Sequence, residues 1–196
     1  LDAETRAALE ALWLHDAQKE HASVPAFARV SWMLAAIGAP AELLERAFTA
    51  AQDEIEHTRL CFALAAGYGG RSHSVEAMPE LLLGGALDVR GSALVHLAVE
   101  SLKDGCLLED YNADVAAACR DACTEPVTRA VLDRIAVEER SHAELSWSIV
   151  EHCLGRDPVG VGVALRHARR GLGIYERPTA VSGAKLALVG RADPAK

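Results

Sequence analysis

Apolar residues recur at helical spacing over four long stretches of this chain. Within each stretch, alanine, leucine, valine or tryptophan returns every three or four residues, which is typical of a helix that buries one face. Glycine and proline end the stretches, and Thr124 before Glu125 and Pro126 is the expected N-cap of the last one. The pattern predicts four long helices, at 4–37, 40–66, 92 to 119 or 121, and 126–154.

The lengths of the connections predict how these helices are arranged. About three residues join the first helix to the second and the third to the fourth, so each pair should form an antiparallel hairpin. The middle connection, 69–90, could span about 60 Å if extended, whereas a helix of about 26 residues is about 39 Å long. We therefore expect an all-α four-helix bundle of two hairpins joined by a long crossover, with one short helical turn at 79–83.

The end of the chain has a different character. Residues 156–196 are rich in glycine, proline and small side chains, with a short basic helix expected at 161–170. We interpret residues 1–155 as the bundle and residues 156–196 as an extension packed on it.

Composition narrows the class of protein. Hydrophobic residues make up 51% of the chain and aromatic residues only 5%, which suits a globular helical protein better than a β-rich one. The net charge of −8 argues against nucleic acid as a partner. No apolar run reaches the roughly 18 residues of a membrane span, so no membrane partner is expected. The five cysteines match no zinc pattern, and we predict reduced thiols in a cytoplasmic protein.

The chemistry of the chain lies in a repeated Glu-x-x-His pattern. Glu54 and His57 stand in the second predicted helix, and Glu139 and His142 stand in the fourth. Three residues correspond to about 300° of helix, so each Glu and His lie one turn apart on the same face and can reach one metal ion. Both pairs point the way the apolar residues point. Buried polar groups need partners, and two divalent cations would supply them.

A four-helix carboxylate site also needs one Glu from each of the other two helices. In the first helix, Glu20 shares a face with apolar residues. In the third, Glu109 and Glu100 are alternatives that lie on opposite faces of a regular α-helix, because nine residues turn through about 900°. The face of Glu109 is the apolar one. Its distance along the helix from the turn between the third and fourth helices also matches that of Glu139 better, so Glu109 is the preferred ligand and Glu100 the alternative. Without metal, repulsion and burial should raise the pKa of some of these carboxyls.

This ligand pattern resembles that of the ferritin-like non-haem di-iron carboxylate proteins, which include rubrerythrins, bacterioferritins and bacterial di-iron oxygenases. The resemblance covers about residues 5–154. It implies a ferritin-like bundle with Glu54 and Glu139 as bridging or chelating ligands and Glu20 and Glu109 as terminal ones. It also implies that Asp53 and Glu138, which precede the two motifs, hydrogen-bond a ligand histidine across the site. The implied metal ligands are Glu20, Glu54, His57, Glu109, Glu139 and His142.

The resemblance implies a function but no single activity. The first reading is an oxidoreductase whose two iron ions, or manganese in their place, activate dioxygen or peroxide to oxidise a small substrate. The first alternative is a ferroxidase or iron-handling protein, in which iron is the substrate. The second is a non-enzymatic helical partner protein that keeps the ligands for structural reasons. A homodimer is compatible with all three readings.

Overall fold

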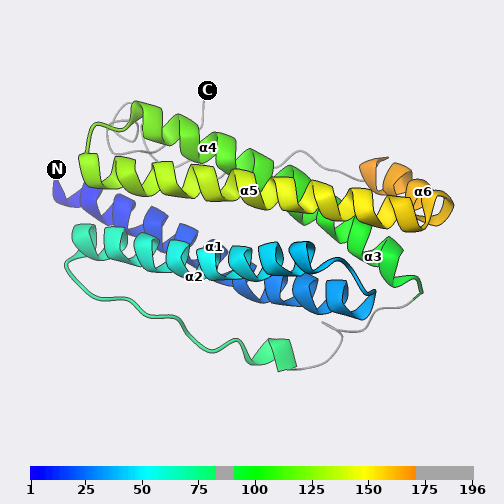
Figure 1. Cartoon of the computed structure of the whole chain (residues 1–196). Helices are drawn as coiled ribbons and strands as arrows, with labels where there is room; N and C mark the ends of the chain where they lie inside the picture. The colour runs from blue at the N-terminus through cyan, green and yellow to red at the C-terminus, as the bar shows by residue number, and fades with distance from the viewer. Residues whose placement is uncertain (83–90, 171–196) are drawn as a thin grey trace. The chain divides into compact units, whose positions relative to one another are not determined.

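The computed structural model describes residues 1–82 and 91–170, and every regular element in these ranges is helical (Figure 1). The predicted all-α class is confirmed. Residues 83–90 of the expected crossover, and residues 171–196 of the expected extension, lie outside the described residues. None of the helices in the described ranges is both long enough and apolar enough to cross a membrane. In chain order they are α1 (Ala3–Ala36), α2 (Ala41–Gly69), η1 (Pro79–Leu82), α3 (Ala93–Glu100), the π-helical η2 (Ser101–Leu107), α4 (Leu108–Ala122), α5 (Pro126–Arg156) and α6 (Pro158–Arg170).

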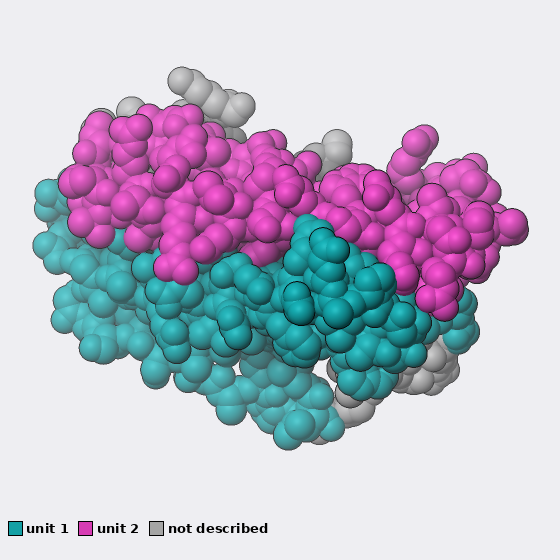
Figure 2. All heavy atoms as spheres, in the orientation of Figure 1, with its two compact units in different colours: residues 1–93 teal, residues 94–196 magenta. Residues whose placement is uncertain are grey.

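The chain divides into two compact units, Leu1–Ala93 and Leu94–Lys196, which Figure 2 shows in different colours. Each contains one of the two predicted hairpins. Our grouping of residues 1–155 as one bundle and 156–196 as its extension stays a prediction.

The first unit is built on the hairpin of α1 and α2, which run antiparallel side by side (Figure 1). Asp2 caps α1 by accepting a hydrogen bond from the backbone N–H of Thr5 at 2.8 Å. The turn between the helices contains Gly38 at φ 65°, a conformation that favours glycine. Buried residues recur along both helices at the predicted spacing. They include Leu9, Trp13, Ala17, Phe27, Ser31 and Leu34 on α1, and Leu43, Ala47, Ala50, Cys61 and Ala65 on α2.

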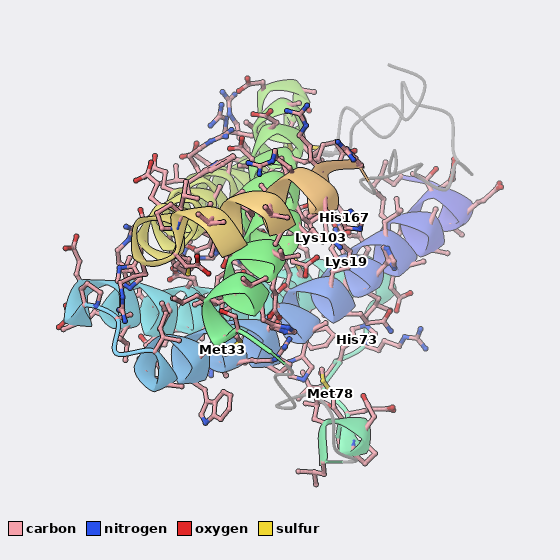
Figure 3. The ribbon with its side chains drawn as sticks, turned by 90° about the vertical axis from the view of Figure 1, so that its right-hand side faces the viewer. Lys19, Met33, His73, Met78, Lys103 and His167 are labelled. Atoms are coloured by element: carbon pink, nitrogen blue, oxygen red, sulfur yellow. The ribbon has the colours of Figure 1, made fainter. Side chains whose placement is uncertain are left out.

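The segment that follows α2 is fastened to the same hairpin. Gly70, at φ 71°, ends the helix, and Arg71 then donates from Nε to Glu10 Oε1 on α1 at 2.7 Å. Two residues later, His73 lies with its Nε2 3.4 Å from the same oxygen. The ring of His73, which is labelled in Figure 3, also stacks on Phe62 of α2, with 6.1 Å between ring centroids. A charged pair and a ring contact therefore hold the start of the connection against α1 and α2.

The second unit pairs the run α3–η2–α4 with α5 as an antiparallel hairpin, and α6 packs on α5 (Figure 1). This hairpin and the short helix near residue 161 are confirmed. The predicted cap was wrong by one residue, because the side chain of Glu125, not Thr124, accepts from the backbone of Val127 at 3.0 Å and Thr128 at 2.6 Å. The longer Glu125 side chain reaches both free N–H groups of the first turn.

The third predicted helix has the expected extent but is not uniform. Residues Ser101–Leu107 form a π-helix between α3 and α4, and hydrophobic periodicity gave no sign of it. Its backbone passes very close to α5, because a Cβ built on Gly105 would lie 2.0 Å from Ser146 Oγ and 2.5 Å from Ser146 Cβ. Glycine at position 105 is thus a condition of this close approach.

The five cysteines are free and buried. Burial is the main reason why the pKa of Cys106 rises to about 12 and that of Cys153 to about 11. At neutral pH these two thiols remain protonated and act as small apolar side chains.

The close approach at position 105 yields a stability prediction. Gly105→Ala should destabilise the protein by about 1–3 kcal/mol, because the new methyl group overpacks against Ser146. Gly67→Ala is the matched control: no atom lies within 4 Å of its Cβ position in α2, so alanine should stabilise by about 0.5–1 kcal/mol. Urea denaturation of both variants measures the two effects.

A second variant tests the named contact directly. Adding Ser146→Gly to Gly105→Ala removes the clashing side chain, so the double variant should lose less stability than the sum of the two single changes. Strict additivity would show that the two residues do not meet.

Candidate metal centre

In the first unit, Glu20, Glu54 and His57 continue the buried stripes of the α1–α2 hairpin. Glu20 lies between Ala17 and Phe27 along the stripe of α1, and its side chain is 15% exposed. Glu54 and His57 lie one turn apart on α2 and are 1% and 0% exposed. Helical spacing alone therefore places three ionisable groups where the hairpin buries its apolar side chains.

These three side chains converge on each other. The Nδ1 atom of His57 is 3.3 Å from Glu20 Oε2 and 3.7 Å from Glu54 Oε2. Each of the three offers a ligand atom, and these atoms all lie within 4.8 Å of one another. One imidazole nitrogen and two carboxylates thus face the same small volume, and we call this set the first triad.

Burial by itself would raise the pKa of Glu20, but the net effect is a lowered pKa. The hydrogen bond and the charge of His57, together with a hydrogen bond from Glu54, outweigh burial. We expected the pKa of only some of the clustered carboxyls to rise, and Glu20, which contacts the His57 imidazole, is not one of them. Glu20 is therefore ionised at neutral pH, and its negative charge would attract a cation.

In the second unit, Glu109 on α4 and the pair Glu139 and His142 on α5 form a second triad. They continue a buried stripe that includes Ala113 and Ala116 on α4. All three are buried, with Glu109 the most exposed at 6%. Their ligand atoms also lie within 4.8 Å of one another.

The second triad has the electrostatics that we expected of metal-free carboxyls. The pKa of Glu109 is well above its usual value, first because it is buried and then because its hydrogen bond with Glu139 and the charge of Glu139 favour the protonated form. His142 and a hydrogen bond from Asn112 lower it only in part. A cation bound at this triad would favour the ionised form of Glu109 instead and would displace its proton.

The donors of each triad suit a divalent metal of the first transition row. Two carboxylate oxygens and one imidazole nitrogen match the preferences of iron and manganese, and zinc accepts the same donors. The six side chains are too little exposed for water alone to solvate their carboxylates. The residues present in each triad therefore fit one metal ion.

No model of a known family, no curated protein and no solved structure matches this chain. The geometry of the two triads and the chemistry of their donors are thus the grounds for a function.

Our premise that Glu100 and Glu109 lie on opposite faces was wrong, because it assumed an unbroken α-helix. The π-helical turns of η2 take up about one extra residue, so the two positions are separated by about 80° instead of about 180°. Consistent with this, the Glu100 side chain is only 18% exposed, and its Oε2 lies 3.5 Å from His96 Nε2. Within the described ranges, the residue groups that could share a metal ion include Glu109 and not Glu100.

The two acidic residues that precede the motifs lie at the edge of the buried stripes. Asp53 and Glu138 are both half-buried. Glu138 accepts from Arg134 Nε, one turn earlier on α5, at 3.0 and 3.2 Å. Their expected hydrogen bonds to a ligand histidine stay a prediction.

Sequence reasoning missed two contacts beside the second triad. Asn112 Nδ2 donates to Glu109 Oε2 at 3.3 Å. Arg140 on α5 pairs with Asp110 and, at 2.6 Å, with Asp114 on α4. The spacing of Asn112, three residues after Glu109 on one helix, is the signal that could have revealed it.

The pKa of Glu109 yields a prediction for the metal-free protein. Glu109→Gln should raise the melting temperature at neutral pH, because its uncharged amide can donate to Glu139 and still accept from Asn112. The raised pKa means that wild-type Glu109 favours folding below its unfolded pKa of about 4.3 and loses that contribution as the pH rises through the folded value. The advantage of the variant should therefore shrink on acidification, as thermal melts across this pH range would show.

Glu20→Gln serves as the opposing case. The pKa of Glu20 is lowered, so its contribution is present above the unfolded pKa and is lost as the pH falls. This variant should therefore melt below wild type at neutral pH, and the difference should narrow in acid. The same response from both variants would contradict the contrast between the triads.

Proposed function

We propose that the two hairpins associate as a ferritin-like four-helix bundle and that the two triads form one dinuclear metal centre. On this proposal, the protein is a non-haem di-iron oxidoreductase that activates dioxygen or peroxide to oxidise a small substrate, with manganese as the alternative metal. The observation that carries the proposal is that each hairpin buries the same donors: two carboxylates from facing helices and one histidine three residues after one of them.

Charge balance supports two ions rather than one. Four carboxylates carry a formal charge of −4 when ionised, and two divalent cations carry +4, while the two imidazoles bind as neutral ligands. A single divalent ion would leave a net negative charge in a buried region, which is costly. The raised pKa of Glu109 is consistent with an excess of negative charge when no cation is bound.

The proposed roles follow from the position of each side chain. His57 and His142 would bind one ion each through a ring nitrogen. Glu54 and Glu139 share a helix face with these histidines and would bridge or chelate, whereas Glu20 and Glu109 would bind terminally. A pair of iron ions would supply reversible one-electron chemistry, which protein side chains alone lack.

Three outcomes separate the proposed reaction from its two alternatives. The chain should be loaded anaerobically with ferrous iron, mixed with dioxygen, and followed by charge-transfer absorption. Oxidation that stops at two irons per chain and turns over when an organic reductant or substrate is added supports the oxidoreductase. Continued oxidation of excess ferrous iron without a co-substrate supports the ferroxidase. Failure to bind iron supports a helical partner protein.

Metal content gives the central prediction for the ligands. Wild-type protein should bind up to two irons per chain, and Glu109→Ala should lose far more metal than Glu100→Ala, since Glu109 belongs to the second triad and Glu100 does not. Elemental analysis after reconstitution measures both. Saturation at zero or one ion in wild type, or the reverse order of the two variants, would refute the assignment.

A further inference from the structure

Asn112 brings a neutral amide against Glu109, a proposed metal ligand. Its Nδ2 lies 3.3 Å from Glu109 Oε2, and the two residues are one turn apart on α4. The asparagine side chain is half-buried. Both groups belong to one helix, so the contact is local to α4.

The chemistry of an amide suits it to orient a metal ligand. Its NH2 group donates to a carboxylate without carrying a positive charge, so it does not compete with a cation for the ligand as a lysine or arginine would. It also occupies one carboxylate oxygen. One oxygen of Glu109 is then left for an ion shared with Glu139 and His142, each of which has a donor atom within 4.8 Å of a Glu109 oxygen.

A second contact fixes α4 against α5 at the same height. Arg140, which follows Glu139, pairs with Asp110, which follows Glu109. The arginine also reaches Asp114 at 2.6 Å, one turn further along α4. These ion pairs oppose sliding of α4 along α5. The Glu109 carboxylate could still rotate about its side-chain bonds, and the hydrogen bond from Asn112 restrains that rotation.

We propose that Asn112 is a positioning residue that limits Glu109 to offering a single oxygen to the ion of the second triad. This inference rests on the proposed function, since it concerns a ligand of that centre. Its consequence is that this ion keeps a coordination position open, which a carboxylate free to rotate would close with its second oxygen. The open position is where a small oxidant or substrate atom would bind.

Cobalt(II) is a suitable probe, because its visible absorption is stronger at low coordination number and reports on the ligands without turnover. Asn112→Leu removes the donor and keeps a similar volume. Relative to wild type, it should weaken one of the two cobalt ions by about 10–100-fold, the usual effect of removing a hydrogen bond to a ligand. It should also lower the visible absorption of that ion, as the second oxygen of Glu109 joins it.

Two further variants keep the test specific. Asn112→Gln retains the amide on a longer arm and should recover part of the cobalt affinity and absorption. Tyr111→Phe alters the exposed neighbour on α4 and should leave both unchanged. Metal-free melts of every variant check folding: equal weakening of both ions, in step with a lower melting temperature, would assign Asn112 a merely structural role and overturn the proposal.

The remaining outcomes distinguish this inference from the proposed function. Two cobalt ions with the same affinities and absorption in wild type and Asn112→Leu would overturn the role of Asn112 and leave the dinuclear centre intact. Fewer than two ions in wild type would overturn the proposed function and this inference with it.

Discussion

Six ionisable side chains lie on the apolar stripes of two helical hairpins, and the cost of burying them is the constraint to which the rest of the structure responds. An uncompensated buried carboxylate loses its hydration, and the protein usually avoids this by pairing the group or by taking up a proton. Both responses are present. The pKa of Glu20 is lowered by its contact with His57, whereas the pKa of Glu109 is raised by burial and by Glu139. A cation at each triad would remove the need for either response.

The surroundings of the two triads differ in a way that their matching motifs conceal. The first triad is built on two uninterrupted α-helices, and the carboxylate of Glu20 contacts the His57 imidazole. The second is preceded by the π-helix of η2 and is accompanied by an amide donor and an interhelical ion pair. π-helical turns are frequent at functional sites, where they alter which side chains face inward. If the proposed centre binds two ions, any difference in reactivity between them should therefore originate on the α4 side.

Much of this arrangement could be predicted from the sequence because it depends on periodicity. The helical extents, the two antiparallel hairpins and the inward direction of Glu54 and Glu139 all follow from residues repeating every three or four positions. The π-helix could not be predicted, because it adds a residue without disturbing composition, and it invalidated the geometric argument against Glu100. Sequence spacing also could not show which carboxyl pKa values would rise, because the direction of the Glu20 shift depends on a contact with His57 across two helices.

The central claim is that the two triads hold a pair of metal ions close together, and X-ray absorption at the iron edge of the reconstituted protein tests it most directly. The account predicts an iron–iron scattering distance of about 3.5–4 Å, as in other two-metal sites, with nitrogen and oxygen neighbours and no sulfur. Iron bound at two ions per chain without any iron–iron scattering would contradict it, because the triads would then be two separate mononuclear sites.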